Sequence, residues 1–150
     1  LAGFRPGIKA AAERQALTPL LDAGLTKADV RSASHAWGLA TWDKPAAACL
    51  SSRIAFGIEI SPSRLARVER AESLVQQALS ASGVPFRNLR VRDLGDEARI
   101  EIDVEYVEAA FAAGAVDIVR AAGFRSAYVD PAGFRSGSLN ELLPQPERWR

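Results

Sequence analysis

The sequence has little cysteine, no long apolar segment and no strong charge of either sign. Cys49 is the only cysteine among 150 residues, which excludes an internal disulfide bond and a zinc or iron–sulfur site built from several cysteines. No apolar run approaches the roughly 20 residues that a membrane-spanning helix needs. The 19 basic and 18 acidic side chains give a formal net charge of +1, so no overall field attracts DNA or a membrane surface.

The N-terminus lacks both an initiating methionine and the pattern of a secretory signal. The segment from Leu1 to Arg5 has no positive region followed by an apolar one. We therefore expect that the chain begins within a longer protein and that this protein is cytoplasmic. The hydrophobic fraction of 48% and the charged fraction of 25% are typical of a folded globular protein rather than a disordered one.

The first part of the chain is predicted to be helical. Residues 8–22 are rich in Ala and Leu and predict one helix. A second helix should begin after Thr26, whose side chain can form a capping box with Asp29, and should end at Gly38. Residues 40–60 have no helical period, and such loop-rich segments often carry functional residues.

From about residue 58 onward the pattern predicts a small two-layer α+β unit. The expected elements are a helix over 61–82, a hairpin of strands 89–92 and 98–102, a helix over 104–122 interrupted at Gly114, and a strand over 126–130. Residues 1–40 are then the helical remainder of a different domain.

The segment from Trp42 to Arg53 has the most distinctive composition. Lys44 and Arg53 lie close to Cys49 in sequence, and positive charge stabilises a thiolate. Ser52 and Arg53 offer a hydroxyl and a guanidinium group that suit an oxyanion or phosphate. The alternative is that Cys49 is a small buried hydrophobic residue, which is the commoner role of a lone cysteine.

Glu72 has an unusual place in the predicted helix 61–82. At 100° per residue it falls within the apolar stripe formed by Leu65, Val68, Val75 and Leu79. A carboxylate that faces a core is costly unless it is paired or has a task. Either a role in a site or a structural salt bridge to an arginine of the neighbouring sheet satisfies this condition.

Arg90 and Arg92 are two residues apart on a predicted strand, so they project from the same face. Two parallel guanidinium groups can clamp a phosphate, but a solvated sheet face often has the same composition, and by itself the pattern favours the solvated face. If helix 61–82 instead packs across this face, Glu72 should meet the arginines there.

Two further polar features are weaker signals. His35 is the lone histidine, and its place near a helix end predicts a surface position. Residues 135–140 can form an anion-binding turn of backbone amides, or simply a polar loop.

Four segments in this order resemble the LarE family, a branch of the PP-loop ATP pyrophosphatases. Trp42 to Arg53 is similar to the family's central signature. The other three are Phe4–Gly7 with Pro19–Lys27, Arg90–Arg92 with Ala98–Glu101, and Phe134–Glu141. Together they cover nearly the whole chain.

The resemblance implies an ATP-dependent sulfur insertase. In this family ATP adenylates a carboxylate of a pyridinium dicarboxylate mononucleotide, and a cysteine attacks the activated carbonyl. Elimination then leaves a thiocarboxylate on the substrate and dehydroalanine in the protein. The product leads to the nickel-pincer nucleotide cofactor of lactate racemase.

The resemblance also assigns roles to residues of this chain. Cys49 would be the sacrificial sulfur donor, and Glu72 would lie in the active site. Ser52, Arg53, Arg90 and Arg92 would bind the substrate phosphate or the activated carboxylate. ATP and Mg²⁺ would be the cofactors, and a closed homo-oligomer would be the assembly.

The implied fold is α/β, with two domains. Residues 1–57 would be the C-terminal part of a PP-loop ATP pyrophosphatase domain and would include the cysteine loop, whereas residues 58–150 would be an α+β domain for substrate binding or oligomerisation. Two departures stand out: the phosphate loop is absent from this sequence, and Ile54–Gly57 replaces the usual Ile-Pro-Tyr-Gly. The alternatives are a related enzyme with a recycling cysteine and a non-catalytic binding module.

Overall fold

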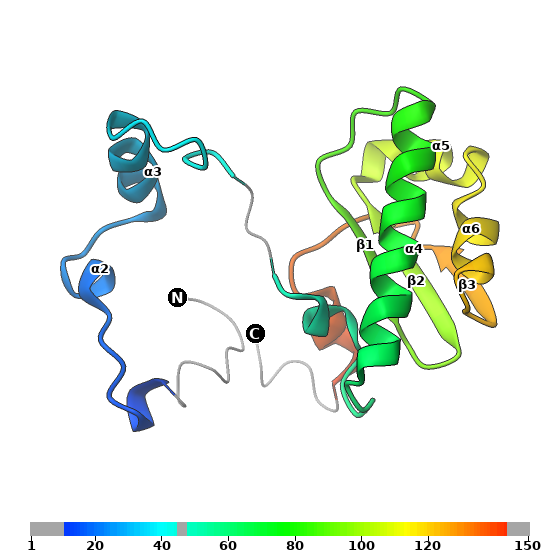
Figure 1. Cartoon of the computed structure of the whole chain (residues 1–150), viewed down its shortest axis with the longest axis horizontal. Coiled ribbons are helices and arrows are strands. Elements are labelled where there is room, and N and C mark those ends of the chain that lie inside the picture. Colours follow the sequence, from blue (N-terminus) through cyan, green and yellow to red (C-terminus); the bar gives the residue numbers. More distant parts are fainter. Residues whose placement is uncertain (1–10, 45–47, 144–150) are drawn as a thin grey trace. The chain divides into compact units, whose positions relative to one another are not determined.

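The computed structural model describes residues 11–44 and 48–143. Two compact units divide the chain between residues 47 and 48 (Figure 1). This division lies earlier than the predicted boundary after residue 57. The reason is that the segment after Cys49 packs on the second unit: Ile54 is 7% exposed within its core, and Arg53 pairs with Glu72.

The first unit contains α2 (Pro19–Asp22) and α3 (Lys27–Ala36). The predicted capping box is confirmed, because the Thr26 side chain accepts from the Asp29 amide and the Asp29 side chain accepts from the Thr26 amide. The prediction of one continuous helix over 8–22 is wrong for its described part. Gln15 has a φ of 53°, and α2 begins separately at Pro19, where proline suits a first helical position. Residues 8–10 lie outside the described residues.

Helix α4 (Pro62–Ala81) confirms the predicted helix 61–82. Its start is fixed by the Ser61 hydroxyl, which accepts from the Arg64 amide at 3.3 Å. Beyond its end Gly83 has a φ of 71°, a conformation that favours glycine. The helix buries one stripe of small and branched side chains, namely Val68, Ala71, Val75 and Leu79.

The second unit contains a three-stranded sheet in the order β1-β2-β3 (Figure 1). The predicted hairpin is confirmed: β1 (Leu89–Asp93) pairs antiparallel with β2 (Glu97–Ile102). Strand β3 (Ser126–Val129) lies parallel to β2, as expected after a helical crossover. The crossover comprises α5 (Val107–Ala112) and α6 (Ala115–Ala121), which are separated at Gly114 with a φ of 73°. No helix in the described ranges is long and apolar enough to cross a bilayer.

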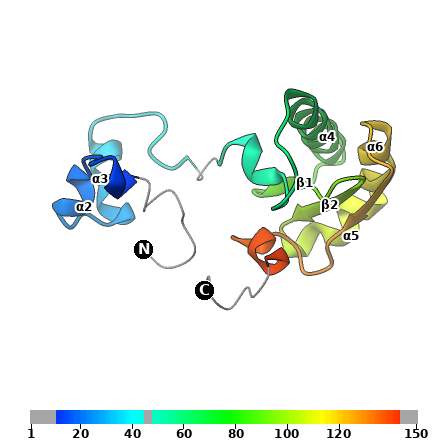
Figure 2. The same cartoon turned by 90° about the horizontal axis from the view of Figure 1, so that it is seen from below.

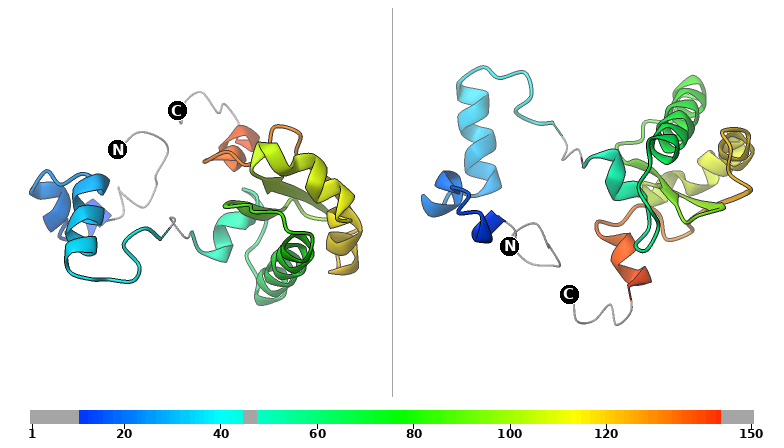
Figure 3. Two further views of the ribbon diagram at one scale, coloured as in Figure 1. Left: turned by 90° about the horizontal axis from the view of Figure 1, so that it is seen from above. Right: turned by 60° about the horizontal axis from the view of Figure 1, so that its bottom comes forward.

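The two faces of the sheet have different partners. Val91, Ile100 and Ile102 are fully buried in one apolar core with α4, α5 and α6. The other face carries arginines, and the C-terminal 3-10 turn η3 (Ser138–Leu142) lies on this side, away from α4 (Figures 2 and 3).

The structure therefore differs from both arrangements considered for the arginine face, the favoured solvated face and the alternative of a covering helix. The face is not solvated, because Arg92 and Glu101 are 7% and 0% exposed beneath η3. Helix α4 does not pack across the arginine face either. Its buried apolar side chains pack instead against the opposite, apolar face of the sheet. The mixed α/β class is confirmed in the second unit, and a PP-loop remnant in residues 1–57 stays a prediction.

Candidate active site around Cys49

Cys49 lies immediately before the 3-10 turn η1 (Leu50–Arg53) in extended backbone, and its side chain is exposed. The interpretation of Cys49 as a small buried residue is therefore wrong. Its carbonyl accepts from both the amide and the hydroxyl of Ser52, at 3.0 and 2.8 Å. These bonds close the turn directly behind the thiol, so the position of Cys49 depends on the shape of η1.

The pKa of the Cys49 thiol is lowered from its ordinary value. The largest cause is a hydrogen bond from the Ser51 side chain, followed by one from the Ser52 backbone. Hydrogen bonds to the charged form favour the thiolate, which is the nucleophilic form of cysteine. Exposure together with a lowered pKa is typical of a reactive cysteine rather than a structural one.

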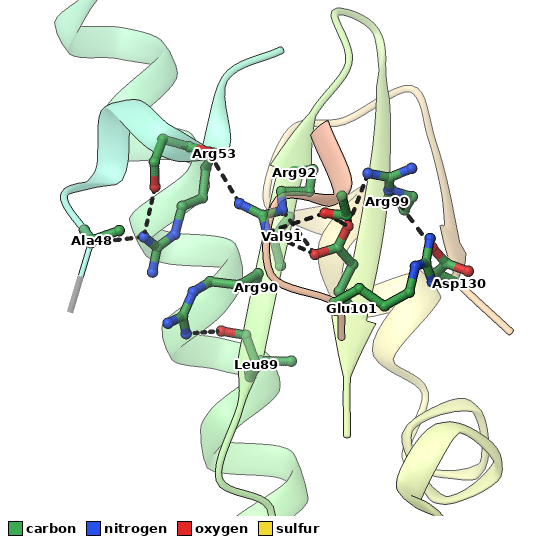
Figure 4. Close-up of polar contacts among 12 residues, drawn as sticks. Ala48, Arg53, Leu89, Arg90, Val91, Arg92, Arg99, Glu101 and Asp130 are labelled. Carbon is green, nitrogen blue, oxygen red and sulfur yellow. Dashed lines mark hydrogen bonds and ion pairs between the residues drawn. The ribbon is translucent and has the colours of Figure 1, made fainter. Parts of the chain in front are cut away.

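Arg53 fixes the cysteine turn from inside. Its Nη1 donates to the Ala48 carbonyl at 2.8 Å (Figure 4). The same nitrogen donates to the Cys49 carbonyl at 3.2 Å and to the Ser52 hydroxyl at 3.1 Å. The Arg53 side chain is 7% exposed, and its Nε and Nη2 donate to Glu72. Arg53 therefore already has protein partners, which favours a positioning role over direct contact with a bound phosphate.

Glu72 joins helix α4 to the edge of the sheet and to the cysteine turn. Its Oε1 accepts from Arg53 Nε at 2.9 Å and from the Val91 amide at 3.0 Å. Glu72 therefore forms the ion pair that one of its two interpretations predicted. Its partner is Arg53 of the cysteine turn, however, and not an arginine of the sheet. The carboxylate also satisfies a backbone donor of the edge strand β1.

Arg92 is buried and connects three segments. Its Nε and Nη2 lie 2.9 and 2.8 Å from Glu101 Oε2, its Nη1 donates to the Ser52 carbonyl at 3.0 Å, and its Nη2 donates to the Ser138 hydroxyl at 3.3 Å. The side chain is 8% exposed. Its protein partners thus occupy most of the donors that a phosphate clamp would use, so the structure does not show two parallel free guanidinium groups.

Arg90 differs from its strand neighbour, because no carboxylate pairs with it among the residues that the structure describes. Its Nη1 donates to the Leu89 carbonyl at 2.6 Å, and its guanidinium carbon lies 5.4 Å from the centre of the Phe134 ring. Burial and then the positive charge of Arg53 lower the pKa of Arg90 from its ordinary value. Figure 4 shows its side chain on the same side of β1 as Arg53 and Ala48.

Among the residues that the structure describes, arginines outnumber carboxylates on this face. Its five arginines are Arg53, Arg90, Arg92, Arg99 and Arg135, and its four carboxylates are Glu72, Glu101, Asp130 and Glu141. Since the other arginines have carboxylates within 4.0 Å, the surplus positive charge lies at Arg90. Glu72 and Glu101 act on Arg90 through their charge, but neither forms an ion pair with it, and such a half-buried cation is suited to an anionic group of a ligand.

Sequence reasoning missed the residues that organise this face, Glu101 and Ser138. Glu101 is fully buried between Arg92 and Arg99, and Ser138 donates to its Oε1 at 2.6 Å. Because side chains alternate along a strand, the sequence of β2 places Glu101 on the same face as the arginines. An arginine neighbour of Glu101 could therefore have been predicted. The contact of Ser138 was not, because it spans 37 residues of sequence.

The described residues offer no group of three His, Cys, Asp or Glu side chains that could hold a metal ion. His35 is exposed and contacts Trp42 edge-to-face at 4.6 Å in the first unit, in agreement with its predicted surface position.

Comparison with known proteins adds information that the geometry does not contain. No family model matches the chain. It is 37% identical to the uncharacterized protein slr1717 of Synechocystis sp. over 147 residues, and this alignment covers 95% of the chain. It is also 32% identical to pyridinium-3,5-bisthiocarboxylic acid mononucleotide synthase of Lactiplantibacillus plantarum over 146 residues, and this alignment covers 96% of the chain.

This similarity supports the LarE family. The chain spans about half the length of these relatives, 53% and 51%. The second relative is named as a synthase of pyridinium-3,5-bisthiocarboxylic acid mononucleotide.

Proposed function

We propose that the chain acts in sulfur insertion, with Cys49 as the sulfur donor to a carboxylate of a pyridinium dicarboxylate mononucleotide. The observation that carries the proposal is an exposed thiol of lowered pKa on a turn that Arg53 holds near Arg90 of β1, which forms no ion pair with a described carboxylate. The similarity to a bisthiocarboxylic acid mononucleotide synthase supports the substrate class.

The chemistry assigned to this chain is nucleophilic attack followed by elimination. The Cys49 thiolate attacks the activated carbonyl carbon, an S–C bond forms, and the leaving group departs with its electron pair. Removal of the Cα proton of Cys49 then breaks its Cβ–S bond. The sulfur stays on the substrate as a thiocarboxylate, and residue 49 becomes dehydroalanine.

The arginine face binds and orients the substrate in this proposal. Arg90 contacts the phosphate or the carboxylate, because it is partly exposed and no described carboxylate forms an ion pair with it. Ser52, Arg53, Glu72 and Arg92 hold the thiol and Arg90 in place through the contacts described above. The carbonyl is thereby presented to a nucleophile of fixed position, which is how orientation lowers a barrier.

ATP and Mg²⁺ belong to the proposal through the resemblance alone. The described residues contain neither a glycine-rich phosphate loop nor a set of three metal-ligating side chains. We therefore assign no residue of this chain to either cofactor and derive no step through them.

The test is intact-mass measurement of the chain after incubation with the mononucleotide supplied as its adenylate, because no residue of this chain is assigned to ATP. We expect a loss of about 34 Da, one H₂S, at residue 49 in proportion to product formed. The Cys49→Ser variant is the control and should form no product. Product formed with an unchanged cysteine would overturn the sacrificial step. Many turnovers with an added sulfur source would indicate a recycling cysteine, and full function of Cys49→Ser would indicate a binding module.

A further inference from the structure

Ser138 and the cysteine turn are linked by one continuous path of polar contacts, although 86 residues separate Ser138 from Ser52. The Ser138 hydroxyl donates to Glu101 Oε1 at 2.6 Å. Glu101 Oε2 accepts from Arg92 Nε at 2.9 Å, and Arg92 Nη1 donates to the Ser52 carbonyl at 3.0 Å. Figure 4 shows the central part of this path on the arginine face.

The hydroxyl of Ser138 contacts both Glu101 and Arg92, and Arg99 Nη2 also lies 2.9 Å from the same Glu101 oxygen. Glu101 has no exposed surface, and Ser138 is 2% exposed, so water cannot replace a lost contact cheaply. The hydroxyl donates to one carboxylate oxygen, which leaves the other for Arg92, and it also accepts from Arg92 Nη2 at 3.3 Å. Because one hydroxyl contacts both partners, it sets the angle at which the guanidinium group faces Ser52.

The far end of the path is the turn that presents Cys49. Within η1 the Ser52 amide and hydroxyl both donate to the Cys49 carbonyl, and the Ile54 amide donates to the Ser51 carbonyl. The bond from Arg92 to the Ser52 carbonyl is therefore a tether from the sheet to the centre of this turn. The hydrogen bonds that lower the Cys49 pKa come from the same two serines, Ser51 and Ser52.

The near end of the path is anchored by its own contacts. Leu139, next to Ser138, is 7% exposed. Arg135 pairs with Glu141 at 3.1 Å, and the Phe134 amide donates to the Ile102 carbonyl at 2.6 Å. Turn η3 is therefore a fixed support rather than a loose terminus, which is what a positioning contact requires.

We propose that Ser138 is a positioning residue that fixes the Cys49 turn through Glu101 and Arg92. The importance of this for sulfur transfer rests on the proposed function, but the positioning itself does not. Its test therefore uses the reactivity and local order of Cys49 and needs neither substrate nor turnover.

The experiment compares Ser138→Ala with Ser126→Ala in the full 150-residue chain. Ser126 is the matched control, because its hydroxyl also donates to a carboxylate, that of Glu97 at 3.2 Å, on the exposed far strand. Alkylation by iodoacetamide reports on residue 49 alone, since it is the only cysteine. Because Cys49 is already exposed, a loss of stability that leaves the chain folded does not change the access of the reagent to the thiol.

We expect Ser138→Ala to slow alkylation about threefold at neutral pH, through a smaller thiolate fraction. Amide hydrogen exchange at Ser52 and Ile54 should become faster, with little change in α4, and Ser126→Ala should leave both measurements unchanged. Equal alkylation and equal exchange in Ser138→Ala and the parent chain would overturn the proposal.

A second variant guards against a failure of Ser138→Ala to fold. Arg92→Lys keeps a positive charge beside Glu101 but removes the guanidinium donor that reaches the Ser52 carbonyl. We expect the same slower alkylation and faster exchange in η1. If this variant folds and Cys49 reacts at the parent rate, the path does not position the turn, whatever Ser138→Ala shows.

Discussion

Arg53 and Glu72 form an ion pair in which Nε and Oε1 lie 2.9 Å apart, with side chains 7% and 18% exposed. The same Oε1 accepts from the Val91 amide at 3.0 Å. One carboxylate thus joins the turn after Cys49, the middle of α4 and the edge of the sheet. Leu50 of η1 packs against the hydrophobic core, and this ion pair is a second, polar attachment of the cysteine turn to the folded unit.

We predict that Glu72→Gln lowers the free energy of unfolding by about 2 to 3 kcal/mol, because it leaves the buried Arg53 without its counterion. The measurement is urea denaturation followed by circular dichroism. Glu69→Gln, on the exposed face of the same helix, is the control and should change stability little. Equal stabilities of the two variants would show that the pair does not hold the turn.

The reactivity of Cys49 should depend on pH with a midpoint below that of an unperturbed cysteine, because hydrogen bonds from Ser51 and Ser52 lower its pKa. Ser51→Ala removes the largest cause, so the midpoint of the alkylation rate should move to higher pH. Ser80→Ala, exposed on α4, is the control. A midpoint that stays in place in Ser51→Ala would argue against this origin of the lowered pKa.

Arg90→Ala should weaken binding of a pyridinium carboxylate mononucleotide about tenfold, the effect of one charge-assisted hydrogen bond. The melting temperature should change little, since no carboxylate pairs with Arg90 within the described residues. Isothermal titration calorimetry measures the affinity. Arg90→Lys should give an intermediate loss, and the exposed Arg70→Ala should give none. Parent-like affinity of Arg90→Ala would place the anion elsewhere.

Gly133 lies where the closing segment crosses the end of β2, and we predict that Gly133→Ala destabilises the fold by about 2 to 4 kcal/mol. Its φ is 67°, and a Cβ there would lie 2.8 Å from both the Ile102 carbonyl oxygen and the Val104 Cα. Gly83→Ala is the matched control, with a φ of 71° and no atom within 4 Å of the added carbon. Gly83→Ala should lower the free energy of unfolding by about 1 kcal/mol, the cost of placing alanine at a positive φ without a steric clash. Equal losses would exclude a steric contribution at Gly133.

Local sequence signals predicted the elements of the second unit well. Ser61 and Pro62 marked the start of α4, Gly114 marked the break between α5 and α6, and alternation marked the hairpin. These signals succeed because capping, glycine conformation and side-chain period act within a few residues. The prediction of one helix over 8–22 was wrong for a local reason too. It relied on the Ala- and Leu-rich composition and overlooked that Pro19 marks the start of a separate helix.

The sequence by itself determined which residue types carry the chemistry: a single cysteine followed by serines and an arginine, and an arginine pair on one strand face. Only the tertiary structure decided their relations. It exposed Cys49, paired Arg53 with Glu72, buried Arg92 against Glu101 and left Arg90 without a carboxylate partner among the described residues. Strand alternation specifies a face but not what covers it, and here the cover comes from Ser138, 46 residues after Arg92.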